Sequence, residues 1–304
     1  MKIKVSSAII KAIAATTPVN QSDLSRGFIS FKDLGSQKQA AAMIPMRFDE
    51  SASIKPSDYL LSANAIKLLL LLCAKHAQCT SAKKSENTPA PTLEIYYDEW
   101  EAILGASQHT ARRRLKAAAK ELYAFAWRHK GEGKKEGELA AFLGRKAEPI
   151  GRHGLSFMLS PLTYEALAKK ARVLDMPDDI FSIDTRRPHS LRLAIALCVR
   201  WCDRGLHPSH RLAGYDGWVA MKSKTACHAA GIPTEGGSGW RRGGARSESV
   251  IGSLHRALSG MGSWCKWAVI DASGQSLSYE DYRGVGVVDF FRNYRVAFTV
   301  KEVN

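Results

Sequence analysis

The sequence predicts an α+β chain in which two related domains follow one another, each combining two helices joined by a tight turn with a β-hairpin. Three observations support this fold class. One helix carries an apolar stripe and an outward basic face, and an alternating apolar strand follows it. The same apolar positions return 139 residues later in a second helix. A glycine precedes each of the two helices, at Gly105 and at Gly231.

Size and charge limit the function classes. A chain of 304 residues has the length of two ordinary domains. Lys and Arg number 44 against 29 acidic residues, which gives a formal charge of +15 at pH 7. Such a charge attracts polyanions, so nucleic acid and anionic membrane surfaces are the partner classes to consider.

The apolar stretches and the cysteines indicate the compartment. The run Leu68–Ala74 is far shorter than the ~20 residues that a membrane-spanning helix needs, so we expect no membrane span. Lys11 interrupts the apolar stretch at the N-terminus, which therefore makes a poor signal peptide. The six cysteines fall mostly within apolar helical or strand patterns, which favours reduced thiols. We expect a cytoplasmic protein.

The first domain is expected over residues 61–178, after a weakly patterned segment at 1–60. Ser62 is placed to cap a helix with one broad apolar face. A short strand, LEIYY, starts at Leu93, and a short helix follows until Gly105 breaks it. These elements lead directly into the basic helix.

The basic helix contains three consecutive arginines, and helical geometry separates them. Ser107 is its expected N-cap. With 100° per residue and Leu115 at the centre of the buried face, Arg113 lies nearly opposite the core, whereas Arg112 and Arg114 flank the boundary. The expected buried stripe consists of Ala111, Leu115, Ala118 and Leu122. Two helices with a tight glycine turn and outward cations are typical of a helix-turn-helix that enters a DNA major groove.

A β-hairpin wing is predicted after this helix. The segment Tyr123–Trp127 alternates like a strand, and Leu155–Leu159 is its expected partner. The connection between them is rich in cations, including Lys134, Lys135 and Arg145. A basic hairpin of this kind would lie along phosphates, although any single cation on it serves equally well to keep a loop soluble. Helix, turn, helix and wing together predict a winged-helix domain.

The second half repeats this plan over residues 179–304. A helix at Pro188–Cys202 and a short helix at Lys222–Ala230 precede a longer helix that starts at Ser247. Its apolar positions are Val250, Leu254, Ala257 and Met261, each 139 residues after its counterpart. A second wing is expected from Trp264–Ile270 paired with Val285–Val300. The matching order predicts two tandem winged-helix domains.

A glycine-rich segment distinguishes the second copy. GIPTEGGSGWRRGGAR stands where the first copy has a three-residue turn, and it contains Arg241, Arg242 and Arg246. It is too rich in glycine to form a core. Two interpretations stay open: the segment is a basic arm that becomes ordered on a phosphate backbone, or it is an insertion without a role.

The order of two basic winged helices, the second opening on FSIDTRRPHSLRLAIALC, resembles the plasmid replication initiator (Rep) family over roughly residues 60 to 300. The resemblance implies that both domains bind repeated origin sequences and that the first also serves in a homodimer. By position, it implies DNA contacts in the first domain from Gln108, His109, Arg112, Arg113 and Lys116. In the second domain it implies contacts from Ser249, Gly252, His255 and Arg256.

Other chemical motifs are weak. Cys198, Cys202, His207 and His210 are zinc-ligand types, but their spacing matches no closed zinc site, so we expect no metal. GEGKKEG is neither of the common phosphate-binding loop patterns. The only close histidine pair, HisProSerHis, differs from the His-x-His pair that rolling-circle initiators use to hold a metal. We therefore expect no cofactor and no enzymatic activity.

The sequence thus predicts a sequence-specific double-stranded DNA-binding replication initiator. It would bind origin repeats, help to destabilise the origin and recruit host replication proteins such as the replicative helicase. A winged-helix transcriptional repressor is the closest alternative, and the tandem, non-identical domains favour the initiator. A nuclease or relaxase is a third class, for which the clustered carboxylates or the His-x-His pair would be needed.

Overall fold

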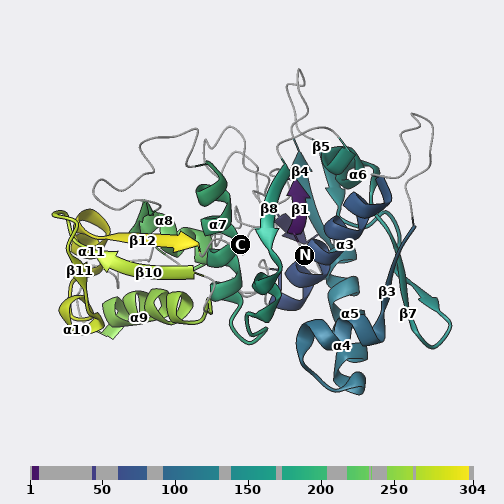
Figure 1. Ribbon diagram of the computed structural model, residues 1–304, viewed down its shortest axis with the longest axis horizontal. Coiled ribbons are helices and arrows are strands. Elements are labelled where there is room, and N and C mark those ends of the chain that lie inside the picture. Colours follow the sequence, from purple (N-terminus) through teal and green to yellow (C-terminus); the bar gives the residue numbers. More distant parts are fainter. Residues whose placement is uncertain are drawn as a thin grey trace, which may run out of the picture. The chain divides into compact units, whose positions relative to one another are not determined.

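The computed structural model divides the chain into two compact units, unit 1 at residues 1–185 and unit 2 at 186–304 (Figure 1). The division lies after Thr185, seven residues beyond the expected boundary at 178. Each unit mixes helices and strands, as expected of an α+β chain. The structure describes residues 2–6, 43–45, 61–80, 92–129, 138–168, 173–203, 218–232, 234, 245–262 and 265–300.

Unit 1 contains a helix, a strand and a helix pair, followed by hairpins. Its helices are α3 (Ala63–Thr80), α4 (Tyr97–Leu104), α5 (Gln108–Ala124), α6 (Pro161–Ala168) and the 3-10 turn η2 (Asp178–Ser182). Its strands are β1 (Lys2–Ser6), β2 (Met43–Pro45), β3 (Thr92–Tyr96), β4 (Phe125–His129), β5 (Glu138–Ala141), β6 (Glu148–Ile150), β7 (Gly154–Met158) and β8 (Val173–Pro177).

The expected pairing of Tyr123–Trp127 with Leu155–Leu159 is wrong. Strand β7 instead lies between β3 and β6 in an antiparallel sheet of order β3-β7-β6. Register explains the choice, because Leu93 lies opposite Phe157 and Ile95 opposite Leu155, and all four side chains are buried. Pairing with β3 therefore brings two apolar faces together.

The strand after α5 forms a separate sheet. Helix α5 continues to Ala124, and β4 then pairs with β5 on one side and with β2 on the other. The N-terminal strand β1 pairs with β8 in a two-stranded sheet of its own. The segment 1–60, left outside both domains by the sequence, thus supplies two strands to unit 1.

Helix α3 is the centre of unit 1. Every residue from Ala65 to Ala74 is buried, and α3 packs against α5, α6 and β1. Ser62 caps it as expected, because the Ala65 N–H donates to Ser62 Oγ at 3.2 Å. Glu121 of α5 accepts from the Ser62 hydroxyl at 2.7 Å, so the start of α3 is tied to α5.

One lysine lies within this core. Lys67 is only 2% exposed, and its Nζ donates to the Phe181 carbonyl at 2.5 Å. Burial lowers the pKa of Lys67 to about 8; Asp184 opposes that shift and Arg114 adds to it. Lys67 therefore joins α3 to the end of η2.

Because Lys67 is buried, the free energy of unfolding of the protein should change with pH in the alkaline range. Between about pH 8 and pH 10.5 the unfolded chain keeps a proton on Lys67 that the folded chain has lost, so raising the pH stabilises the fold. The difference in free energy of unfolding between the wild type and Lys67→Met should increase by on the order of 3 kcal/mol between the two ends of this pH range, in favour of the wild type. Urea unfolding at a series of pH values measures it, and a pH-independent difference would contradict the assignment.

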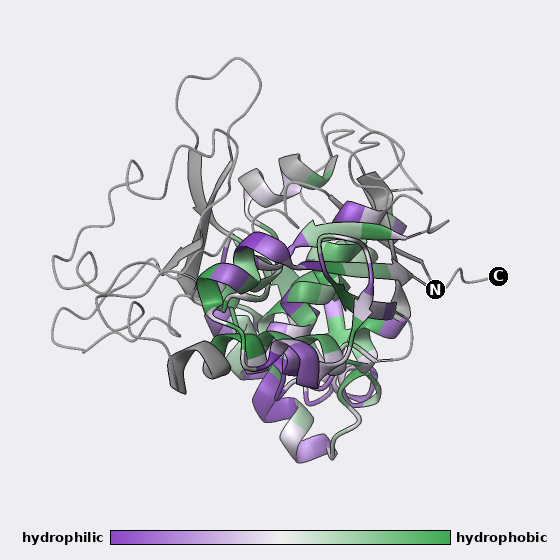
Figure 2. Ribbon diagram, turned by 90° about the vertical axis from the view of Figure 1, so that its left-hand side faces the viewer, coloured by the Kyte–Doolittle hydropathy of each residue, from purple (hydrophilic) through white to green (hydrophobic). Residues whose placement is uncertain are grey.

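Unit 2 repeats the order helix, strand, two helices and paired strands. Its helices are α7 (Pro188–Asp203), α8 (Ser223–Ala230), α9 (Ala245–Ser259), α10 (Tyr279–Tyr282) and α11 (Val287–Asn293). Its strands are β9 (Val219–Lys222), β10 (Cys265–Ile270), β11 (Ser276–Leu277) and β12 (Arg295–Val300). From the side of unit 2, helices show green and purple stretches in turn, as amphipathic helices do (Figure 2).

The sheet of unit 2 has the order β11-β10-β12-β9. The expected pairing of Trp264–Ile270 with Val285–Val300 is confirmed for β10 and for the last six residues of the second segment, Arg295–Val300. The expected strand Val285–Val300 is nevertheless too long, because its first part forms α11 and only Arg295–Val300 is a strand. Phe290 is fully buried, and the period of the apolar residues in VVDFFRN fits a short helix.

The two units share their core positions. Ala111, Leu115, Ala118 and Leu122 of α5 are at most 1% exposed, and Val250, Leu254, Ala257 and Met261 at most 5%. In each unit the strand that precedes the helix pair lies beside the last strand of the sheet, and that last strand pairs on its other side with an earlier strand that follows the helix pair: β3-β7-β6 and β9-β12-β10. The buried stripe therefore repeats at the constant offset, whereas the strand after it does not: β4 lies in a separate sheet, and its counterpart at the offset, β10, pairs with β12.

Candidate nucleic-acid interface

The turn between α4 and α5 sets the direction of the basic helix. Gly105 ends α4 in the left-handed region, with φ of 57°, and its N–H donates to the Glu101 carbonyl at 2.9 Å. Ser107 directly precedes α5, and its hydroxyl donates to Thr110 Oγ1 at 3.2 Å. The helix break and the start of α5 lie where the sequence predicted them.

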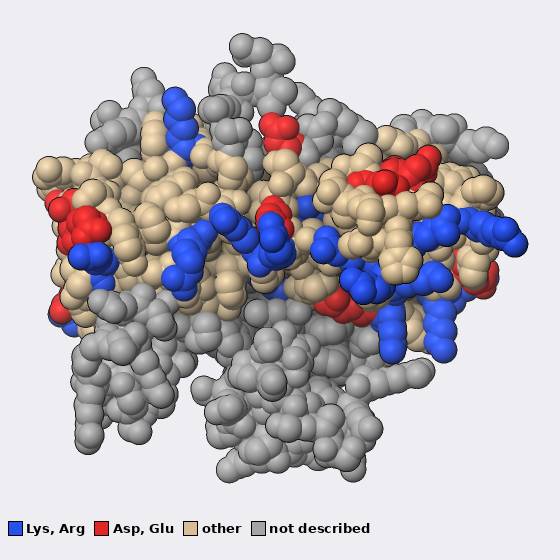
Figure 3. All heavy atoms as spheres, turned by 90° about the horizontal axis from the view of Figure 1, so that it is seen from below, with Lys and Arg blue, Asp and Glu red and all other residues tan. Residues whose placement is uncertain are grey.

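Helix α5 separates apolar from basic residues. Leu115 and its stripe face the core, and the opposite side is exposed. The exposed polar positions of α5 are Gln108, His109, Arg113, Lys116 and Lys120. Figure 3, which looks onto the side of unit 1 that carries α4 and α5, shows Lys and Arg side chains gathered there. The five exposed polar residues Gln108, His109, Arg113, Lys116 and Lys120 are called the α5 basic face below.

The three arginines point in different directions, as the helical wheel predicted. Arg113 is exposed, whereas Arg114 is half-buried and its Nη1 donates to Thr185 Oγ1 at 3.3 Å. Arg112 departs from the expectation of a DNA contact. Its guanidinium lies 4.9 Å from the centre of the Tyr97 ring, and Nη2 donates to the Arg152 carbonyl at 3.3 Å. Its side chain is thus already engaged by the protein.

The hairpin β6–β7 ends in an exposed tip, residues Gly151, Arg152 and His153. Gly151 has φ of 51°, and the His153 N–H closes the turn on the Ile150 carbonyl at 3.0 Å. The Tyr97 N–H donates to the His153 carbonyl at 2.8 Å, which fixes the tip to the start of α4. The contact from Arg112 places the same tip beside the α5 basic face.

Of the other cations expected to contact DNA, the structure describes only some. Arg145 is exposed in the segment before β6, where it forms a surface ion pair with Glu148 at 3.2 Å. Lys134 and Lys135 lie outside the described residues. The same holds for the side chains of Arg241, Arg242, Arg246 and Ser249. Their expected DNA contacts stay predictions.

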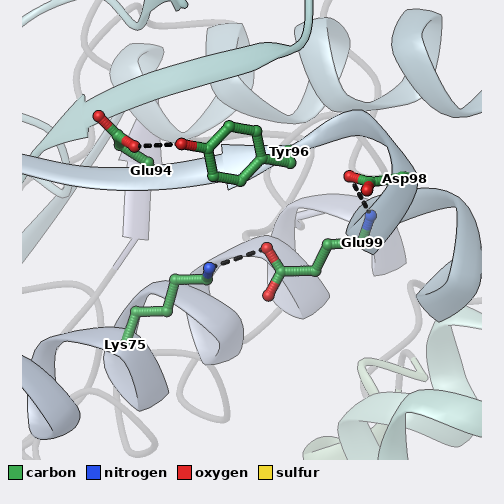
Figure 4. Close-up of polar contacts among 5 residues, drawn as sticks. All are labelled: Lys75, Glu94, Tyr96, Asp98 and Glu99. Atoms are coloured by element: carbon green, nitrogen blue, oxygen red, sulfur yellow. Dashed lines mark hydrogen bonds and ion pairs between the residues drawn. The ribbon is translucent and has the colours of Figure 1, made fainter.

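Three acidic side chains of β3 and α4 are engaged with other groups (Figure 4). Glu99 pairs with Lys75 of α3 at 2.8 Å. Asp98 accepts from the Glu99 N–H at 2.8 Å in the first turn of α4, where a negative charge also stabilises the helix. Glu94 accepts from the Tyr96 hydroxyl at 2.6 Å and raises the pKa of Tyr96.

The cations of the α5 basic face have no such partners. Within the part of the chain that the structure describes, no carboxylate pairs with Arg113, Lys116 or Lys120. Like charges three and four residues apart weaken a helix by about 0.2–0.5 kcal/mol per pair. The arrangement does not favour stability, and an external polyanion would relieve the repulsion.

The corresponding face of unit 2 is covered. At the 139-residue offset, Gly252 replaces Arg113 and His255 replaces Lys116. Gly252 is buried, and a Cβ on it would lie 3.2 Å from the Tyr279 hydroxyl. Helix α10, which the sequence did not predict to be a helix, thus lies over Gly252 in this structure, and the DNA contact of Gly252 stays a prediction.

His255 is held by the same helix. Its ring stacks on Tyr279 with 4.1 Å between centres, and Nδ1 lies 2.8 Å from the Tyr282 hydroxyl. Burial lowers the pKa of His255, and Arg256 lowers it further, so the ring is neutral near pH 7. His255 is therefore part of an aromatic cluster rather than an open cation. Arg256 is exposed, and its guanidinium donates to Ser253 Oγ at 3.1 Å.

The zinc-ligand types of the sequence are not brought together in the described residues, where no group of three or more His, Cys, Asp or Glu could hold a metal ion. Cys198 is a buried cysteine of α7. His207 and His210 lie outside the described residues. Within the described ranges, no helix is both long enough and apolar enough to span a membrane.

Comparisons with known proteins give limited similarity. The sequence matches no protein family and no curated protein. Among solved structures, one of a Pi initiator protein in complex with iteron DNA has a TM-score of 0.40 and 15% sequence identity. The alignment covers 79% of this chain and 96% of the other. At this level of similarity the function has to be argued from the residues of the chain itself.

Proposed function

We propose that each unit is a winged-helix domain. In unit 1, α3, α4 and α5 would be the three helices and β6–β7 the wing, and in unit 2 the same roles fall to α7, α8, α9 and β10–β12. The support is the order of elements and the shared sheet order β3-β7-β6 and β9-β12-β10. The short turn at Gly105 and the αL glycine Gly231 after α8 match the helix-turn-helix pattern.

Unit 1 binds double-stranded DNA with α5 in the major groove and the β6–β7 tip against the backbone. The observation that carries this proposal is the α5 basic face, whose exposed cations lack carboxylate partners in the described residues and lie beside the tip. An α-helix fits the major groove, and Arg and Lys there can contact base edges and phosphates. Each phosphate neutralised releases counterions, which drives binding.

The chain acts as a replication initiator. It would bind origin repeats, help to destabilise the adjacent duplex and recruit host proteins such as the replicative helicase, with a homodimer among its forms and no catalytic step of its own. Two related but different units on one chain support this role, because they allow one protein to occupy a long, asymmetric site.

One observation favours a second candidate. Tyr279 and Tyr282 of α10 cover the positions of α9 that correspond to Arg113 and Lys116, so among the described side chains the open basic helix face is that of unit 1. A winged-helix transcriptional repressor needs one open helix and no strand opening. The two candidates therefore differ in what happens to the DNA after binding.

Selection and footprinting with the full chain test the proposal. Selection from random duplexes should enrich one sequence, and footprints should recur on tandem copies of it. On a supercoiled plasmid that carries the repeats, permanganate should then detect unpaired thymines beside them only if the chain is an initiator. Footprints without unpaired thymines would favour the repressor over the initiator, and the absence of any enriched sequence would exclude both.

A further inference from the structure

Arg112 occupies a position on α5 between the core and the α5 basic face, and its contacts are internal. The cationic guanidinium carbon lies 4.9 Å from the centre of the Tyr97 ring, a cation–π distance. Tyr97 is itself buried, at 6% exposure, at the start of α4. One end of the Arg112 side chain is thus fixed by an aromatic face of the neighbouring helix.

The other contact of Arg112 reaches the wing. Nη2 donates to the Arg152 carbonyl at 3.3 Å, across forty positions of sequence. The Tyr97 N–H donates to the next carbonyl, that of His153, at 2.8 Å. Two successive carbonyls of the tip therefore accept hydrogen bonds from the two helices. The charged Arg112 of α5 donates to the first, and the backbone N–H of Tyr97 in α4 donates to the second.

The geometry of Arg112 argues against a direct DNA contact. Its Nε is buried, and in the described part of the chain it has no hydrogen-bond partner. A phosphate or a base edge binds an arginine best when two parallel N–H groups are available to it. The buried Nε is unavailable for a side-on pair with Nη2, and one Nη2 N–H is already donated to the tip.

We infer that Arg112 is a positioning residue that holds the β6–β7 tip in register with α5, so that Arg152 and the α5 basic face meet one stretch of backbone together. This inference rests on the proposed DNA binding for its consequence but not for its geometry. Without Arg112 the tip keeps one of its two anchors, the Tyr97 N–H. Arg152 would then be free to leave the common surface.

The first test needs no DNA. In Arg112→Ala, hydrogen exchange at the His153 and Tyr97 amides should accelerate at least tenfold, whereas Arg113→Ala, the adjacent exposed position, should leave both rates unchanged. Tyr97→Phe keeps the ring and should behave as wild type. An Arg112→Ala protein that is folded by circular dichroism and has unchanged exchange at these amides would overturn the inference.

The second test is a double-mutant cycle on DNA binding. Arg112→Ala and Arg152→Ala should each lower affinity about tenfold, and the double variant should bind little more weakly than either, because both changes act on the same interaction of the tip with DNA. If the double variant instead lost affinity by the product of the two single reductions, Arg112 would contact DNA itself. If Arg113→Ala and Lys116→Ala also left DNA binding unchanged, the proposed function would fail, and the exchange experiment would still decide the positioning role.

Discussion

Arg113→Ala should weaken sequence-specific DNA binding by about 1 to 3 kcal/mol and relax discrimination at one base pair, because Arg113 is the exposed arginine at the centre of the α5 basic face. Arg114→Ala should change affinity far less, because its guanidinium is bound to Thr185 within unit 1. Binding of both variants to the selected duplex and to single-base variants of it measures the difference.

The neighbouring arginines make this comparison well controlled. Both variants lose one positive charge from the same helix, so any general electrostatic effect is equal in the two. Circular dichroism and urea unfolding establish that each variant folds. Equal reductions in affinity at the two positions, or no reduction at Arg113, would contradict the orientation of α5 toward DNA.

Leu115→Ala and Leu254→Ala should each destabilise the protein by about 2 to 5 kcal/mol, because both side chains are at most 1% exposed and each lies at the centre of the buried stripe of its helix. Leu115→Ala should affect the unfolding of unit 1, and Leu254→Ala that of unit 2. Urea unfolding followed by hydrogen exchange assigns each destabilisation to its unit.

Matched controls lie next to these positions on the same helices. Lys116→Ala and Arg256→Ala alter exposed residues and should change stability by no more than about 0.5 kcal/mol. A destabilisation below about 1 kcal/mol at either leucine would show that the corresponding helix does not bury the stripe that the repeat predicts.

The helices were the most predictable part of the fold. Apolar residues at spacings of three and four identified the buried stripe of α5, and Gly105 marked the turn before it. These signals are local, since a helix and its cap are fixed by residues within one or two turns. The same local periodicity separated Arg113 from Arg114 before any tertiary contact was known.

Strand partners and inserted elements were harder to predict. The sequence paired Leu155–Leu159 with the wrong strand, because two alternating segments compete for one partner and only the sheet as a whole decides between them. Helix α10 has four residues, too few for a periodic signal, although Gly252 marks where it packs. The Arg112 contact with Arg152 joins residues far apart in sequence and leaves no local pattern.

The most direct test of the central claim, that unit 1 binds duplex DNA through α5 and the tip, is the salt dependence of binding. Lys116→Gln, Lys120→Gln and Arg152→Gln together should reduce the slope of log affinity against log salt by roughly 3, at about 0.9 for each phosphate that the protein no longer neutralises. A control that removes the same charge from unit 2 outside the strands of its proposed wing, Lys222→Gln, Arg283→Gln and Arg292→Gln, should change the slope much less. An unchanged slope in the first variant, or equal changes in both, would contradict the assignment of the DNA interface to α5.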